Sequence, residues 1–280
     1  MEQKNKSTEE KLRSVRHIAL DMDGTIYCGS TLFDCTLPFL ATLRRLGIGY
    51  SFMTNNPTRS IADYVAKLRA MGVEATADQV YSTSVATIEF IKTNHPEWRR
   101  LFILGTASMT AEFVAAGFEP TSDSPDDRPD ALVVSFDTSL RYERFCRAAW
   151  WVKEGLPYLA TNPDQYCPTD SRTVLIDCAA IYGAIEIATS RRPDTVIGKP
   201  NAEILRSVAR RQGVAVNEIA MVGDRLTTDV QTAHNAGAVG VLVLSGETSP
   251  EQAAAAIPQP HITVQDIGEL GRLLESVHEK

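Results

Sequence analysis

The feature that most constrains the fold is a repeated alternation of short apolar runs with segments of helical spacing. The first two apolar runs are residues 18–20 and 48–53, and residues 38–46 between them have helical spacing that stops at Gly47. A strand, a helix and a second strand in this order are typical of a parallel sheet with helices on its faces. Right-handed crossovers place both strand ends at one edge of that sheet. The pattern therefore predicts an α/β fold.

The alternation continues to the end of the chain. Further strands are predicted at residues 101–104, 131–136, 158–160, 195–197, 219–222 and 239–244. Further helices are predicted at residues 59–71, 85–93, 108–116, 141–153, 179–189, 201–212 and 228–235, with a last strand and helix within 257–274. The first 16 residues are polar and charged, and we expect them to fray.

Polar residues follow four of the predicted strands. Asp21 and Asp23 follow the first strand, Thr54 follows the second, and Lys199 and Asp224 follow two strands near the C-terminus. Each residue has a simple structural interpretation as part of a turn or a helix cap. Gathered at one sheet edge, however, they would offer acids for a cation, a hydroxyl group for an anion, and one lysine.

Phosphoryl transfer is the chemistry that needs such a set. Mg²⁺ prefers oxygen ligands in octahedral geometry, and Asp21 and Asp224 fit as two of them. One carboxylate can attack phosphorus and a second can move protons. Lys199 would neutralise the phosphoryl oxygens, and Thr54 with the following backbone amides would hold them.

Four segments resemble the four motifs of the haloacid dehalogenase (HAD) superfamily of phosphatases. They are residues 21–25, 51–55, 198–200 and 223–229. From Arg16 onward the chain is similar to the subfamily IIA branch, which contains NagD-like nucleotide phosphatases, para-nitrophenyl phosphatases and pyridoxal phosphate phosphatases. The resemblance implies a Rossmann-like, doubly wound parallel sheet core of residues 1–90 and 191–280. It also implies an inserted α/β cap domain of residues 91–190 that selects the substrate.

The same resemblance implies a role for each motif residue. Asp21 is the expected nucleophile and Asp23 the general acid/base, while the side chains of Asp21 and Asp224 and the backbone carbonyl of Asp23 would hold Mg²⁺. Asp229 would orient waters or Lys199. The residues expected to bind the substrate or its phosphate group are Thr54, Asn55, Asn56, Phe136, Asp137, Asp164, Cys167 and Lys199. Relatives that act on pyridoxal phosphate have a histidine near the position of Cys167 and a tyrosine near that of Phe136, so this substrate is disfavoured.

The sequence thus predicts an Mg²⁺-dependent phosphatase of small metabolites, such as sugar phosphates or nucleoside monophosphates, that works through an aspartyl-phosphate. A phosphotransferase or mutase with the same intermediate, and a catalytically silent binding protein on the same fold, remain alternatives. The role of Asp177, which precedes Cys178, is open, and helix capping is its simplest interpretation.

Composition restricts the partners and the location. The formal net charge of −7 argues against a broad nucleic-acid footprint and against an anionic membrane surface. The chain has no apolar stretch of membrane-spanning length. Five scattered cysteines with no Cys-x-x-Cys pair favour reduced thiols and a cytoplasmic protein. The resemblance adds a possible homodimer through the cap.

Overall fold

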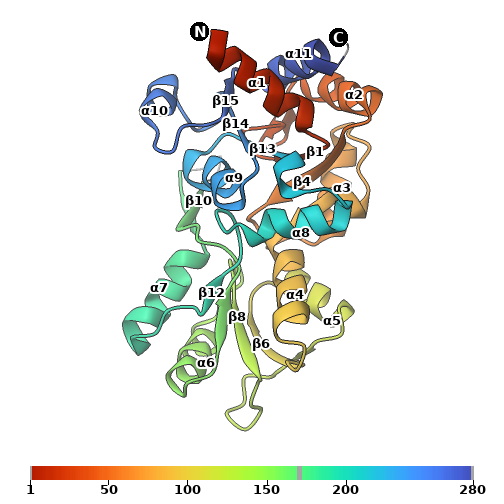
Figure 1. Ribbon diagram of the computed structural model, residues 1–280. Helices are drawn as coiled ribbons and strands as arrows, with labels where there is room; N and C mark the ends of the chain where they lie inside the picture. The colour runs from red at the N-terminus through yellow and green to blue at the C-terminus, as the bar shows by residue number, and fades with distance from the viewer. Residues whose placement is uncertain (1, 169–171, 279–280) are drawn as a thin grey trace. The chain divides into compact units, whose positions relative to one another are not determined.

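The computed structural model describes residues 2–168 and 172–278 (Figure 1). Contacts divide the chain into two compact units, which we call the core unit and the inserted unit. The core unit comprises Met1–Thr54, Val65–Tyr81 and Lys199–Lys280, and the inserted unit comprises Asn55–Tyr64 and Ser82–Gly198. The division of the chain into domains at residues 90 and 190 stays a prediction.

A six-stranded sheet forms the centre of the core unit. In spatial order its strands are β15 (Ile262–Val264), β14 (Val239–Val243), β13 (Ile219–Gly223), β1 (His17–Asp21), β4 (Gly49–Thr54) and β5 (Val80–Ser82). The strands from β15 to β4 are parallel to their neighbours. β13 and β14 are buried along their whole length, as expected for strands covered on both faces.

Helices cover both faces of this sheet. The helices of this unit are α2 (Thr36–Leu46), α3 (Ile61–Ala70), α8 (Glu203–Gln212), α9 (Gln231–Ala236), α10 (Pro250–Ala255) and α11 (Ile267–His278), and the first turn of α3 falls in the inserted unit. The crossover from β1 through α2 to β4 and the crossover from β13 through α9 to β14 run in opposite directions along the sheet. Right-handed crossovers therefore place α2 and α9 on opposite faces, with α11 packed against α2 and α8 against α9 (Figure 1). The predicted doubly wound α/β fold is confirmed.

The expectation that the N-terminus frays is wrong. Residues Glu2–Ser14 form helix α1, which contacts α11. Leu12 is only 1% exposed, and its carbonyl oxygen lies 3.3 Å from His278 Nε2. The sequence obscured this helix because its few apolar residues are embedded in a highly charged segment and find their partners at the other end of the chain.

The inserted unit has a parallel sheet of its own. In spatial order its strands are β12 (Thr195–Val196), β9 (Tyr158–Ala160), β8 (Ala131–Val134), β6 (Arg100–Leu104) and β7 (Glu119–Pro120). Its helices are α4 (Thr83–Asn94), α5 (Ala107–Ala115), α6 (Tyr142–Lys153) and α7 (Cys178–Thr189). Alternate residues of β6 pack on opposite faces: Leu101 and Ile103 lie with Met109 and Phe113 of α5, and Phe102 lies in the cluster that includes residues of α6 and α7.

Short elements complete the two units. The hairpins are β2 (Tyr27–Cys28) with β3 (Thr31–Leu32) in the core unit, and β10 (Tyr166–Pro168) with β11 (Val174–Ile176) in the inserted unit. Two 3₁₀ turns, Ala77–Gln79 and Val216–Glu218, precede β5 and β13. Among the described residues, none of the helices combines the length and the apolar character needed to cross a membrane.

Candidate active site

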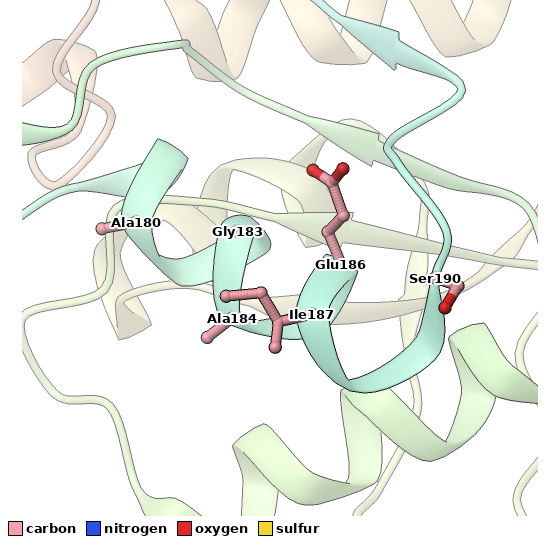
Figure 2. A pocket seen from close by; sticks show the side chains of 6 residues that line it. All are labelled: Ala180, Gly183, Ala184, Glu186, Ile187 and Ser190. Atoms are coloured by element: carbon pink, nitrogen blue, oxygen red, sulfur yellow. The ribbon is translucent and has the colours of Figure 1, made fainter.

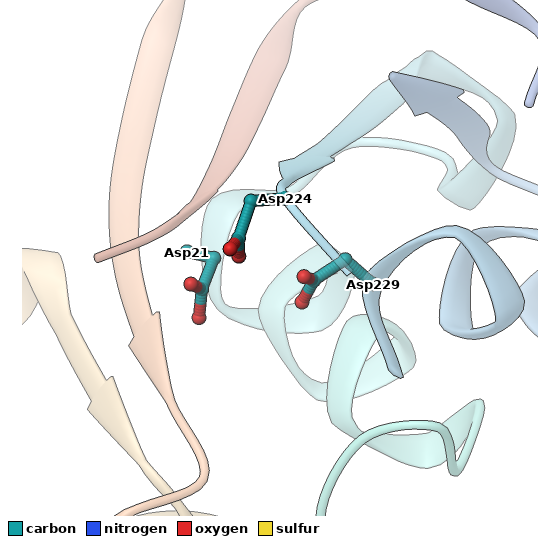
Figure 3. A group of neighbouring side chains, drawn as sticks. All are labelled: Asp21, Asp224 and Asp229. Carbon is teal, nitrogen blue, oxygen red and sulfur yellow. The ribbon is translucent and has the colours of Figure 1, made fainter. Parts of the chain in front are cut away.

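Three aspartates meet at the carboxyl edge of the core sheet (Figure 3). Asp21 is the last residue of β1, Asp224 directly follows β13, and Asp229 lies in the π-helical turn that comes next. β1 and β13 are adjacent parallel strands, so their ends bring Asp21 and Asp224 together. One carboxylate oxygen from each of the three residues lies within 4.8 Å of the others. The predicted convergence of these acids at one sheet edge is present.

Lys199 binds two of the three carboxylates. Its Nζ donates to Asp21 Oδ1 at 2.5 Å and to Asp229 Oδ1 at 2.6 Å, and its side chain is 4% exposed. Three ionised carboxylates and one ammonium group carry two net negative charges. This remaining charge equals that of one divalent cation, and buried charges are stable only when they are paired or bound to metal.

The electrostatics of the cluster favour a further cation. Burial raises the pKa of Asp21 to about 7, helped by Asp229 and Asp224 and opposed by Lys199. Burial and Asp229 likewise raise the pKa of Asp224 to about 6, against a backbone hydrogen bond from Glu247. Burial acts to lower the pKa of Lys199, but Asp21 and Asp229 outweigh it and raise that pKa. A bound cation would relieve the repulsion among the carboxylates and keep them ionised near neutral pH.

The Asp224 carboxylate is packed closely by backbone, in a site we call the cradle, and one of its oxygens has no hydrogen-bond partner among the described residues. Its Oδ2 accepts a hydrogen bond from the Glu247 backbone N–H at 2.7 Å, whereas its buried Oδ1 has no hydrogen-bond partner among the described residues. A Cβ on Gly24 would lie 2.4 Å from Oδ2, and a Cβ on Gly246 would lie 2.1 Å from it. Only glycine fits at these two positions. A buried, unpaired carboxylate oxygen beside two further carboxylates suits a hard divalent ion such as Mg²⁺.

The segment that follows β14 completes this cradle, and sequence reasoning missed it. Ser245 Oγ donates to the Gly24 carbonyl at 2.8 Å, and Thr248 Oγ1 donates to the Asp224 carbonyl at 2.5 Å. The available signal was its position, because a run of small and polar residues directly follows an apolar strand of the same sheet. The only acid in that run, Glu247, contributes its backbone N–H to the site and not its carboxylate. Its presence in the sequence therefore did not mark the run as part of the site.

Asp23 and Thr54 lie on the same edge of the core unit. Asp23 is exposed, in a tight turn that Gly24 closes by donating its N–H to the Tyr27 carbonyl at 2.8 Å. Thr54 is the last residue of β4, the strand next to β1, and its neighbour Met53 pairs with Asp21. The core unit thus brings together the predicted nucleophile, acid/base, lysine and threonine positions.

Asn55 and Asn56 follow Thr54 in the chain but belong to the inserted unit. The side-chain amide of Asn55 donates to Asp164 Oδ2 at 2.8 Å. Asn56 Oδ1 accepts hydrogen bonds from the backbone N–H and the hydroxyl of Thr58. Both side chains therefore make structural contacts within the inserted unit, and a phosphate-binding role for them stays a prediction.

The remaining substrate residues named from the resemblance lie in the inserted unit. Phe136 is 2% exposed and packs with Cys178, and the half-buried Cys167 packs against the same cluster. Asp137 Oδ1 accepts hydrogen bonds from the backbone N–H and the hydroxyl of Ser139. Contact of these residues with substrate stays a prediction.

Asp177 has a defined structural role, which confirms the capping interpretation. It is the N-cap of α7, and its Oδ1 accepts a hydrogen bond from the Cys178 N–H at 2.6 Å. The same oxygen accepts a second hydrogen bond from the Asn162 amide at 2.9 Å. The second bond was not evident from the sequence, because it joins the helix to a loop 15 residues earlier.

A hollow on the surface of the inserted unit contains none of the predicted site residues. It lies along α7 and has a volume of about 830 Å³ (Figure 2). The residues that line it are Ala180, Gly183, Ala184, Glu186, Ile187 and Ser190. It has no cluster of polar groups that could perform the chemistry of the aspartate site.

Comparison with known proteins agrees with this geometry. Residues 18–119 match the family model of haloacid dehalogenase-like hydrolases, and residues 196–270 match the HAD-hydrolase-like model. A crystal structure of 4-nitrophenylphosphatase from Thermotoga maritima is 38% identical, with a TM-score of 0.88 over 94% of this chain and 98% of that chain. The acid sugar phosphatase of Staphylococcus saprophyticus is 28% identical over 94% of this chain and 100% of that protein. The glycerol phosphate phosphatase of Mycobacterium tuberculosis, in complex with magnesium, is 27% identical with a TM-score of 0.84, over 94% of this chain and 78% of that one.

A parallel α/β sheet with clustered carboxylates and a buried lysine at its carboxyl edge defines a metal-dependent hydrolase of phosphate esters. The chain belongs to the haloacid dehalogenase-like hydrolases, and its similarity to NagD-like proteins and 4-nitrophenylphosphatases confirms the predicted branch. It is a phosphoric monoester hydrolase that acts on small phosphorylated compounds and uses Mg²⁺.

Proposed function

We propose that this phosphatase hydrolyses sugar or polyol phosphates through an aspartyl-phosphate formed on Asp21. A carboxylate oxygen of Asp21 attacks phosphorus, and the bond from phosphorus to the leaving oxygen breaks. The observation that carries the proposal is the position of Asp21, which ends β1 in contact with Lys199 and beside Asp224 and Asp229. A partly buried carboxylate that is already paired with a fixed ammonium group is well placed to receive an anionic phosphoryl group.

The neighbouring residues divide the remaining work. Asp23 protonates the leaving oxygen, then takes a proton from the water that attacks the aspartyl-phosphate, and this second step regenerates Asp21. Lys199 neutralises charge on the phosphoryl oxygens and Thr54 donates its hydroxyl to one of them. Asp21 and Asp224, with the carbonyl of Asp23, would hold Mg²⁺, which when bound would supply positive charge to the transferred group. Asp229 holds Lys199 in place through its 2.6 Å contact.

The substrate class is proposed from the relatives that are an acid sugar phosphatase and a glycerol phosphate phosphatase. Nucleoside monophosphates are the main competitors, because another relative is a 5′-nucleotidase. A phosphate-release screen with Mg²⁺ over sugar phosphates, glycerol phosphates and nucleoside monophosphates decides between them. The highest kcat/KM on nucleoside monophosphates would overturn the sugar or polyol assignment. Adding free sugar acceptors to the same screen would reveal a phosphotransferase, because a phosphorylated acceptor would then replace free phosphate.

Asp21→Asn tests the mechanism directly. We expect it to abolish release of 4-nitrophenol from 4-nitrophenyl phosphate, because the amide is a poor nucleophile. Mass spectrometry of acid-quenched wild-type enzyme should find phosphate on Asp21. Asp78→Asn is the matched control, since Asp78 is exposed in a 3₁₀ turn of the core unit. Full activity of Asp21→Asn would refute the mechanism.

We further propose a cytoplasmic homodimer that forms through the inserted unit. Exposed apolar side chains support it: Ile187 on α7 is 87% exposed, and Tyr166, Val174 and Ile176 on the β10–β11 hairpin are between 52% and 60% exposed. Surfaces of this kind commonly mark contacts between proteins. Light scattering of the wild type and of Ile187→Glu, together with Ile176→Glu, should show a dimer that the substitutions weaken. A wild-type monomer at micromolar concentration would contradict it.

A further inference from the structure

Four polar side chains form a continuous chain of hydrogen bonds in the inserted unit. Asn55 Nδ2 donates to Asp164 Oδ2 at 2.8 Å, and Asn162 Nδ2 donates to the same oxygen at 2.9 Å. Asn162 Nδ2 also donates to Asp177 Oδ1 at 2.9 Å. An amide NH₂ group has two hydrogens, so Asn162 can link the two carboxylates without sharing a proton.

The centre of this chain is buried and has a single orientation. Asn162 is 0% exposed and Asp177 is 4% exposed. The Thr161 hydroxyl lies 2.8 Å from Asn162 Oδ1, which fixes the oxygen side of the amide and turns its NH₂ toward the two carboxylates. Asp177 is anchored in turn by the N–H at the start of α7. The chain of bonds therefore begins on a helix end and finishes on Asn55.

Asn55 is also constrained on its other sides. Its carbonyl oxygen accepts a hydrogen bond from Thr83 Oγ1 at 3.0 Å. Its Oδ1 lies so close to the backbone of Gly198 that a Cβ there would approach it to 2.8 Å. Gly198 itself donates its N–H to the Thr161 carbonyl at 2.8 Å. Asn55 and Gly198 thus pack tightly together against the loop that begins at Thr161.

Covalent connectivity gives this packing a functional meaning. Asn55 is bonded to Thr54, and Gly198 is bonded to Lys199. Thr54 and Lys199 are the two residues to which the proposed mechanism assigns phosphoryl contacts. Whatever fixes the backbone of Asn55 and Gly198 therefore fixes the points at which these two segments enter and leave the inserted unit.

We propose that Asp164, held by Asn162 and Asp177, is a positioning residue that orients Asn55 and so sets the segment carrying Thr54, and that it does not contact the substrate's leaving group. This inference deepens the proposed function and rests on it. Asp164 Oδ2 accepts two hydrogen bonds from protein amides. Asp164 therefore affects binding of the phosphoryl group, which all substrates share, because it positions the segment that carries Thr54.

The alternative is that Asp164 recognises the part of the substrate beyond the phosphate. The two roles differ in a measurable way. A positioning residue affects all phosphomonoesters alike, whereas a leaving-group contact affects only those substrates that make it. Substrates with unlike leaving groups therefore separate the two.

The experiment measures kcat and KM of Asp164→Ala and Asp164→Asn with 4-nitrophenyl phosphate, a sugar phosphate and a nucleoside monophosphate. Asp164→Ala should lower kcat about ten- to a hundredfold on all three substrates, as expected when a reacting group is misplaced. Asp164→Asn should recover most of this loss, because one amide oxygen can still accept both hydrogen bonds. Asp130→Ala is the matched control: Asp130 also accepts two hydrogen bonds, from the backbone N–H groups of Arg99 and Arg100, and it lies before β8 in the same unit.

A loss confined to one substrate, or wild-type activity of Asp164→Ala, would overturn the inference. If Asp164→Ala does not fold by circular dichroism, Asn162→Ser replaces it. That variant removes the Asn162 hydrogen bonds to Asp164 and Asp177 but leaves the contact between Asn55 and Asp164, and it should lower kcat a few-fold on all three substrates. If Asn162→Ser leaves kcat unchanged, or lowers it on only one substrate, the positioning role of Asp164 is refuted. A wild-type enzyme that releases no phosphate would refute the proposed function instead, so the two failures are distinct.

Discussion

Gly246 should be essential for metal binding although it offers no ligand side chain. A Cβ at this position would lie 2.1 Å from Asp224 Oδ2 and 2.6 Å from Asp224 Cβ. Non-bonded heavy atoms pack at separations of about 3.5 Å or more, so Asp224 has to move by more than about 1 Å in Gly246→Ala. Gly24 also packs closely against this carboxylate, since a Cβ there would lie 2.4 Å from the same Oδ2.

A displacement of this size cannot be absorbed by the ion. Mg²⁺ requires near-ideal octahedral geometry with ligand distances of about 2.0–2.1 Å, so a carboxylate shifted by about 1 Å no longer coordinates. We expect Gly246→Ala to raise the Mg²⁺ concentration for half-maximal activity at least about tenfold and to lower kcat about a hundredfold. The assay is hydrolysis of 4-nitrophenyl phosphate over a Mg²⁺ titration.

The control separates this effect from general damage to the fold. Gly183 lies in α7, and a Cβ there would meet nothing within 4 Å. Gly183→Ala should therefore keep wild-type activity and gain a little stability from the better helix former. A Gly246→Ala enzyme that folds, as judged by its melting curve, and that has the wild-type Mg²⁺ dependence would refute the reasoning.

Three further predictions concern protons and metal. Asp23→Asn should cost far more activity on an alkyl phosphate, whose leaving oxygen needs a proton, than on 4-nitrophenyl phosphate, and equal losses of kcat/KM would contradict the role of Asp23. His17 is buried 2.8 Å from Ser51 Oγ, and burial lowers its pKa to about 4, so the unfolded chain binds the extra proton and stability falls as pH drops from 6.5 toward 4. By pH 5 the loss in the free energy of unfolding is about 2 kcal/mol. Urea unfolding of the wild type and of His17→Gln should therefore show a difference in stability that varies with pH. When a chelator removes the metal, the raised pKa values of Asp21 and Asp224 have the opposite effect to that of His17. The folded chain then binds more protons than the unfolded chain, so stability falls as pH rises from about 4 to 7. Mg²⁺ should abolish this fall in thermal melts. Identical melting curves with and without Mg²⁺ at pH 8 would contradict it.

The parts of the site that sequence could predict are those fixed by strand topology. Asp21, Thr54 and Asp224 each stand where an apolar run ends, and parallel strands bring such ends to one edge. The fold class followed from the same alternation, since short buried runs separated by helical segments have few other solutions. The strand before Lys199 belongs to the other sheet, so the expectation that one sheet edge gathers all these strand ends is wrong for Lys199. Its side chain nevertheless contacts Asp21.

The parts that sequence could not predict depend on close approach between distant backbones. The sequence suggests that Gly24 and Gly246 are ordinary turn glycines, and only the packed structure reveals that both lie against the Asp224 carboxylate. Asp177 was recognisable as a cap, but its second hydrogen bond to Asn162 depends on the fold of a loop. Local pattern specifies which face or edge a residue occupies, whereas such contacts depend on how separate segments pack.

Double variants test whether Gly246 and Asp164 affect kcat independently of each other. Gly246 acts on Asp224 within the core unit, and Asp164 acts on Asn55 within the inserted unit, so the two act through different residues. Free-energy changes at separate sites usually add within about 0.5 kcal/mol, so Gly246→Ala with Asp164→Ala should multiply the two losses of kcat. Asp164→Ala with Asn55→Ala should be no worse than Asn55→Ala alone, because both remove the same hydrogen bond. Multiplied losses in this second pair would mean that Asp164 acts on catalysis by a route other than Asn55.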